Sequence, residues 1–159
     1  MPRIPTVEYE NASAEAKKEY ENQLRQHGRI TNMKKTLLNH VPSFKVLMEW
    51  YPLRDMVAEV VGDFGVNVFA HAISSQNNCM ICSTFFRRIL IDAGYNPDNL
   101  VLNERDTLLA EYGVFCVNGG HEPSDRLFAR MKRYFTDSEI VLLTTFAGMM
   151  IATNLINNA

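Results

Sequence analysis

The feature that most constrains this chain is a pair of cysteines, Cys79 and Cys82, where a polar turn meets an apolar helical segment that runs to about Gly94. Residues at this spacing are neighbours on a helix, so both sulfurs lie on one face. Such a pair can close a disulfide or share a metal ion. A helix N-terminus favours thiolate over thiol and can lower a cysteine pKa from about 8.5 into the physiological range. Cys79, nearest the open end, is therefore the predicted nucleophile, and Cys82 the resolving partner.

Length and composition predict one domain over residues 1–159. The chain is 47% hydrophobic and has a net charge of −2, which favours neither disorder nor a basic surface that binds nucleic acid. Residues 1–5 lack the apolar core of a secretory signal, so we expect a cytoplasmic protein. In that reducing compartment a CxxC pair is typical of redox catalysis or metal binding rather than of a structural staple. The odd third cysteine, Cys116, also argues against a disulfide framework.

Helical spacing of apolar residues runs through the whole chain, and no segment follows a strand period better, so the predicted fold is all-α. Trp50, the only tryptophan, is predicted to be a core anchor. We also consider a short helix near 98–102. Two short helical segments are predicted, the first starting at Thr31 and ended by Pro42, the second starting at Ser43 and ended by Pro52. The other predicted helices cover 14–27, 55–61, 64–75, 79 to about 94, 104–117, and about 124–134.

A last helix is predicted from a capping box, in which Thr136 and Glu139 satisfy each other's backbone donors. It runs over 140–156 with almost no charge. A membrane span needs ~20 mostly apolar residues, whereas this run is shorter and contains polar residues such as Thr144 and Asn154. We therefore expect a buried or interface helix, and no association with a membrane.

The polar turn Asn77-Asn78-Cys79-Met80-Ile81-Cys82, the helices around it and the segment 135–140 together resemble the carboxymuconolactone decarboxylase superfamily, on its alkylhydroperoxidase (AhpD-like) side. Residues 3–5 and 28–32 share this resemblance, which covers nearly the full length. It implies an AhpD-like helical bundle that assembles as a trimer or hexamer. It also implies that the cysteine pair reduces hydroperoxides, with a glutamate and a histidine completing a proton relay and a thiol reductant protein as partner.

The chain departs from this family at both relay positions. Asn67 stands where the family has its glutamate, and Phe86 stands where it has its histidine. Neither side chain can exchange a proton near neutral pH. His71, one helical turn after Asn67, is the candidate acid–base group in their place, the alternative being an inert histidine on a helix face. The candidate catalytic residues are thus Cys79, Cys82 and His71.

The residues leave other uses of the cysteines open. Cys79, Cys82, Cys116 and His121 could supply the Cys₃His ligands of a zinc site. Cys116, flanked by apolar residues, is more simply explained as a small core residue, and the thiols of the pair could also be buried and inert. We therefore expect no metal and no cofactor.

Three functions follow from this sequence. The first is a peroxidase-like thiol–disulfide oxidoreductase that acts on a small hydroperoxide. The second is a lyase or isomerase of the decarboxylase type, which predicts that Cys79→Ser leaves turnover intact. The third is a non-catalytic oligomeric binding protein. All three are compatible with a homo-oligomer that binds small molecules and no nucleic acid.

Overall fold

The computed structural model describes residues 3–119 and 125–159, and within these ranges every regular element is helical. The all-α class is therefore confirmed, and so is the position of the cysteine pair at the start of a helix. In chain order the elements are the 3₁₀ turn η1 (Tyr9–Asn11) and the helices α1 (Ala14–His27), α2 (Asn32–Leu37), α3 (Val41–Trp50), α4 (Leu53–Gln76), α5 (Met80–Asp92), α6 (Glu104–Val117), α7 (Asp125–Met131) and α8 (Asp137–Asn158).

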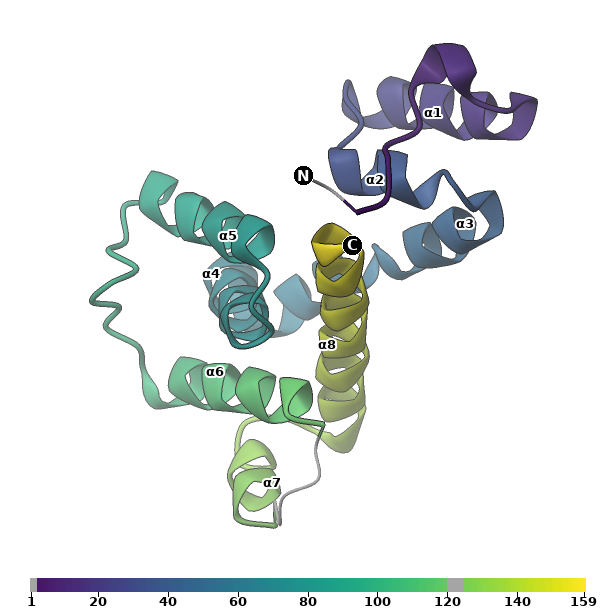
Figure 1. Cartoon of the computed structure of the whole chain (residues 1–159). Helices are drawn as coiled ribbons and strands as arrows, with labels where there is room; N and C mark the ends of the chain where they lie inside the picture. Colours follow the sequence, from purple (N-terminus) through teal and green to yellow (C-terminus); the bar gives the residue numbers. More distant parts are fainter. Residues whose placement is uncertain (1–2, 120–124) are drawn as a thin grey trace.

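Helices α4 and α8 are central to the molecule (Figure 1). Helix α4 packs against α5, α6 and α8, and α8 also contacts α2, α3, α5 and α6. Helix α7 packs against α6. The main core lies between α4, α6 and α8. Its centre is an aromatic stack in which the ring centroid of Phe69 lies 6.4 Å from that of Tyr112 and 5.8 Å from that of Phe146. Burial of three large rings makes this stack a major source of stability.

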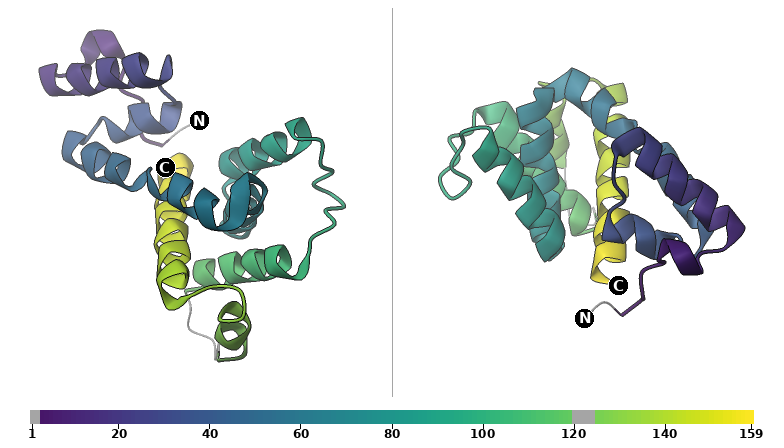
Figure 2. Two further views of the ribbon diagram at one scale, coloured as in Figure 1. Left: turned by 180° about the vertical axis from the view of Figure 1, so that it is seen from behind. Right: turned by 90° about the horizontal axis from the view of Figure 1, so that it is seen from above.

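A second apolar cluster joins α1, α2 and α3 around the buried side chain of Phe44. Ala152 and Ile156 of α8 pack against this cluster, so α8 supplies side chains to both cores. Figure 2 shows α8 running between α1–α3 on one side and α4–α6 on the other. The description of residues 1–159 as one domain remains a prediction.

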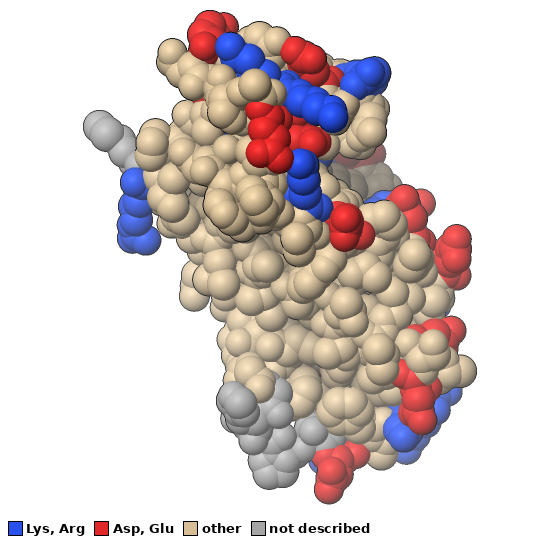
Figure 3. Space-filling model, turned by 90° about the vertical axis from the view of Figure 1, so that its right-hand side faces the viewer, with Lys and Arg blue, Asp and Glu red and all other residues tan. Residues whose placement is uncertain are grey.

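Helix α1 is the solvated outer helix that its charges indicate. Its bounds match the predicted range 14–27: Ser13 caps it by accepting from the N–H of Ala16, and Gly28 ends it in the left-handed conformation. Lys45 of α3 bonds Glu15 at 2.7 Å. Figure 3 shows charged side chains gathered over this part of the molecule, with a largely uncharged surface below it.

The predicted boundary at Pro42 is wrong. Helix α3 begins at Val41, with Pro42 inside its first turn, and the ring of His40 rather than Ser43 caps it. Proline is tolerated there because the N–H it lacks would have no partner within the helix.

Other differences involve backbone continuity and burial. The two helices predicted over 55–61 and 64–75 form one element, α4, which is kinked at Gly62 with φ 77° and ψ 164°. Residues 98–102 are not helical.

Trp50 is 38% exposed and lies beside a groove, so it is not a core anchor. The helix predicted from about 124 appears as α7, and Ser124 lies outside the described residues.

Two segments, Val41–Gln76 and Asp137–Asn158, are long and apolar enough to cross a membrane by length and composition alone. Core helices often pass the same test, and in each segment a large share of the apolar stretch is buried inside the structure. The first segment also contains the α3–α4 junction and the kink at Gly62. The expectation that neither segment enters a membrane remains a prediction.

Candidate redox site at the start of helix α5

A tight turn between α4 and α5 carries the cysteine pair to the start of α5. Asn78 adopts φ 53°, a left-handed conformation that asparagine tolerates better than most residues. The backbone N–H of Cys79 then donates to the carbonyl oxygen of Ser74 at 3.0 Å. This bond closes the turn, so that α5 runs back along α4.

Cys79 and Cys82 form a disulfide, with their Cα atoms 5.3 Å apart. Cys79 is the N-cap of α5, and its sulfur accepts from the backbone N–H of Cys82 at 3.3 Å. Cys79 is 0% exposed, whereas Cys82 is 6% exposed. Both cysteines are thus buried, and Cys82 is the one with some exposed surface, although its position nearest the helix end made Cys79 the predicted nucleophile.

The last turns of α8 approach the same pair of sulfurs. Asn157 Nδ2 donates to Cys82 Sγ at 3.2 Å. Each sulfur therefore has its own N–H donor: a backbone amide for Cys79 and a side-chain amide for Cys82. Sequence reasoning missed Asn157; the available signal was three asparagines, at 154, 157 and 158, at the end of a largely apolar helix.

A buried polar pair lies beside the turn. Ser74 and Asn154 are both fully buried, and Ser74 Oγ donates to Asn154 Oδ1 at 3.4 Å. Within the described residues, the Nδ2 atoms of Asn154 and Asn77 are buried without a hydrogen-bond partner. Because Ser74 also accepts from Cys79, this pair links α8 to the turn that carries the cysteines.

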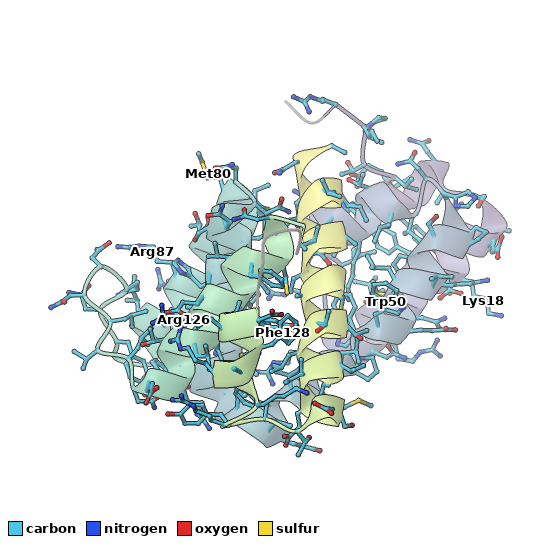
Figure 4. All side chains as sticks on the ribbon, turned by 90° about the horizontal axis from the view of Figure 1, so that it is seen from below. Lys18, Trp50, Met80, Arg87, Arg126 and Phe128 are labelled. Atoms are coloured by element: carbon cyan, nitrogen blue, oxygen red, sulfur yellow. A yellow bond between two sulfur atoms is a disulfide. The ribbon has the colours of Figure 1, made fainter. Side chains whose placement is uncertain are left out.

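The outer surface around the disulfide is apolar. The two residues between the cysteines, Met80 and Ile81, are 80% and 64% exposed, and Phe85 one turn later is also exposed. Figure 4 shows Met80 projecting at the tip of α5, far from Trp50. An exposed apolar surface beside a reactive group is typical of a site that receives a partner or an apolar substrate.

His71, the third candidate catalytic residue, lies on α4 and faces Arg87 of α5. Burial lowers the pKa of His71, and the charge of Arg87 lowers it further. Arg87 itself is held by Asp98 through two bonds of 2.8 and 2.5 Å. Among the described residues, no hydrogen bond joins His71 to either sulfur. Its catalytic role remains a prediction.

The two positions at which the family resemblance implies a glutamate and a histidine contain no acid–base group. Asn67 is buried on α4, and Phe86 of α5 packs against the main core. Neither position can therefore supply a proton to the sulfurs.

Two of the four residues considered as zinc ligands, Cys79 and Cys82, are joined in the disulfide. Cys116 lies on α6, and burial raises the pKa of its thiol to about 11, which is typical of an inert thiol. His121 lies outside the described residues. Within residues 3–119 and 125–159 no three side chains of His, Cys, Asp or Glu gather at one point.

A shallow apolar groove of about 350 Å³ lies elsewhere, between α3 and α8. Trp50 and Val46 line one side of it, and Ala152 and Ile156 the other. Neither cysteine lines this groove, so it is separate from the disulfide site.

Comparison with protein-family models, with curated proteins and with solved structures gives no match. The structure itself shows an all-helical fold, within the described residues, with a CxxC disulfide at the start of a helix.

Proposed function

We propose that this protein is a thiol–disulfide oxidoreductase in which Cys79 and Cys82 cycle between disulfide and dithiol. The observation that carries the proposal is the pair of donors at the sulfurs, Cys82 N–H for Cys79 and Asn157 Nδ2 for Cys82. Hydrogen bonds to a charged acceptor favour the thiolate, which is the form that reacts.

The slightly greater exposure of Cys82 supports an order of events in reduction. A thiolate of a dithiol reductant attacks Sγ of Cys82, the S–S bond breaks, and Cys79 leaves as a thiolate. The second thiol of the reductant then attacks the mixed disulfide and releases the thiolate of Cys82. The reductant becomes a disulfide, and its two protons pass through solvent to the two cysteines.

We propose a hydroperoxide as the oxidant, as the family resemblance implies. The thiolate of Cys82 attacks the terminal oxygen of ROOH, the O–O bond breaks, and ROH leaves after taking a proton from solvent. The resulting sulfenic acid is attacked by Cys79, which forms the disulfide and releases water. Because Asn67 and Phe86 replace the relay, we expect this step to be slow relative to thiol exchange.

The apolar rim of Met80, Ile81 and Phe85 supports a reductant that is itself a protein with an apolar surface around its thiols. Burial of this rim against another apolar surface would stabilise the complex. A small charged thiol offers no such surface.

We also propose that copies of the chain associate through α8. Val141, Thr145, Gly148 and Leu155 follow heptad spacing and form an exposed strip. The hydroxyl of Thr145 donates to the carbonyl of Val141 at 2.9 Å, so the strip presents its methyl group. An uncharged strip of this length favours contact with another helix over contact with water.

The test is turnover of an organic hydroperoxide with a dithiol as electron donor, in wild type and in Cys82→Ser and Cys116→Ala. The proposal requires that Cys82→Ser abolish turnover and that Cys116→Ala retain it. Turnover that survives Cys82→Ser contradicts the dithiol cycle. Turnover of a small lactone that survives Cys79→Ser assigns the protein to the decarboxylase-type alternative.

A further inference from the structure

We infer that Asn157, at the end of α8, is the residue that stabilises the thiolate of Cys82 in the reduced protein, in place of the missing acid–base relay. This inference rests on the proposed function, because it concerns the reduced state of the same cysteine pair. It adds a residue that lies outside the motif and on a different helix.

The contact itself has the right chemistry. An amide N–H at 3.2 Å from sulfur can only donate, and the acceptor is the sulfur of Cys82. When that sulfur becomes a thiolate, the bond gains strength because its acceptor is then charged. A donor whose bond is stronger in the charged state favours ionisation.

Burial makes a protein donor necessary at this sulfur. Cys82 is 6% exposed, so few water molecules can solvate its thiolate. Desolvation alone would favour the neutral thiol. The backbone N–H of Cys82, the natural donor at a helix start, already faces the sulfur of Cys79. Asn157 is the side-chain donor recorded at Cys82 within the described residues.

The surrounding structure holds Asn157 in place. Asn154, one turn earlier on α8, is fully buried and accepts from Ser74 Oγ at 3.4 Å. Ser74 in turn accepts from the N–H of Cys79 at 3.0 Å. The turn of α8 that carries Asn157 is thereby tied to the turn that carries the cysteines, so little conformational entropy is lost when the amide meets the sulfur.

The experiment measures alkylation of the reduced protein against pH, with Cys116→Ala as background so that only the pair reacts. Fragmentation of the peptide that contains both cysteines assigns the rate to Cys82. The variants are Asn157→Ala, Asn157→Asp and Asn157→Gln, with Asn158→Ala as the matched control. Asn158 is adjacent and exposed.

We expect Asn157→Ala to raise the apparent pKa of Cys82 by about one unit, which slows alkylation about tenfold at a pH below the pKa. Asn157→Asp is nearly isosteric and places a negative charge at the sulfur, so it should raise the pKa further. Asn157→Gln should recover part of the wild-type rate, because it restores an amide donor. Asn158→Ala should leave the profile unchanged.

A profile for Asn157→Asp that superimposes on that of wild type would overturn the inference, and so would an equal shift in Asn158→Ala. If Asn157→Ala fails to fold, the nearly isosteric Asp variant still tests whether the side chain at 157 acts on this sulfur, and the Gln variant tests whether an amide donor is what it supplies. Since alkylation needs neither peroxide nor reductant, the outcome is independent of turnover. A protein with the expected profiles and no turnover would retain this inference and contradict the proposed function.

Discussion

The side-chain amide of Asn157 lies 3.2 Å from the sulfur of Cys82, although the two residues are 75 positions apart in the chain. The contact joins the end of α8 to the start of α5, and it brings a donor to a sulfur that is almost buried. The site is therefore larger than the CxxC motif. It consists of the helix start, the turn after α4 and the last turns of α8.

The two cysteines should differ in their reaction with an external disulfide. Because Cys82 is 6% exposed and Cys79 is fully buried, Cys79→Ser should form a mixed disulfide with oxidised glutathione at least several-fold faster than Cys82→Ser. Intact mass against time measures both rates, in a Cys116→Ala background. Faster reaction of Cys82→Ser would show that Cys79 is the attacking residue, as its position at the helix end first indicated.

Cys116 should make the free energy of unfolding depend on pH. Burial raises the pKa of its thiol from 9.0 to about 11. Between these values the unfolded chain loses a proton that the folded chain keeps, so stability is present below pH 9.0 and falls as pH rises toward about 11. The loss is at most about 2 kcal/mol.

Urea unfolding of the oxidised protein at about pH 8 and about pH 10.5 measures this loss. Burial also raises the pKa of Tyr51, to about 12, so the informative quantity is the difference between wild type and Cys116→Ala. The variant should lose less stability over this interval. Equal losses would mean that the Cys116 thiol titrates alike in both states.

Substitution of two glycines by alanine should change the free energy of unfolding in opposite directions. A Cβ at Gly113 would lie 3.0 Å from Ile73 Cγ1 and 3.2 Å from ring carbons of Phe69, where α6 crosses α4. Gly113→Ala should therefore destabilise the protein by about 1–3 kcal/mol. Gly148 has nothing within 4 Å of its Cβ position, so Gly148→Ala should stabilise α8 by up to about 1 kcal/mol. Urea unfolding of dilute protein compares the two. Unchanged stability in Gly113→Ala would contradict the packing described for α6, and destabilisation by Gly148→Ala would contradict the open space beside α8.

A charge on the exposed strip of α8 should weaken self-association. Leu155→Lys places a charge within an otherwise uncharged strip, whereas Val101→Lys, at a loop residue that is 91% exposed, is the matched control. Sedimentation equilibrium should show a shift toward smaller species for Leu155→Lys alone. A wild-type protein that is monomeric at all concentrations would refute association through α8.

The features of the fold that could be predicted from sequence are those set by residues close together in the chain. Thr136 forms the predicted capping box, and Ser13 and Asn103 cap the helices predicted over 14–27 and 104–117, because a cap depends on residues only two or three positions away. The cysteine pair was located for the same reason. The predicted gap between 61 and 64 contains the kink at Gly62, but whether the chain continues as one kinked element depends on packing against α6 and α8.

The parts that sequence could not predict depend on contacts between distant segments. Trp50 lies beside an open groove because α8, a hundred residues later, does not cover it. Asn157 meets Cys82 only after α4, α5 and α8 have packed together. The lowering of the pKa of His71 by the charge of Arg87, which lies on another helix, likewise required the fold.

The measurement that tests the central claim most directly is the mass of the reduced Cys116→Ala protein after one equivalent of an organic hydroperoxide, followed by addition of a dithiol. The account predicts a single Cys79–Cys82 disulfide that forms completely and reopens with the dithiol over repeated cycles. Unreacted thiols, or cysteines oxidised beyond the disulfide without cycling, would contradict a redox-active pair and leave the disulfide a structural feature of the helix start.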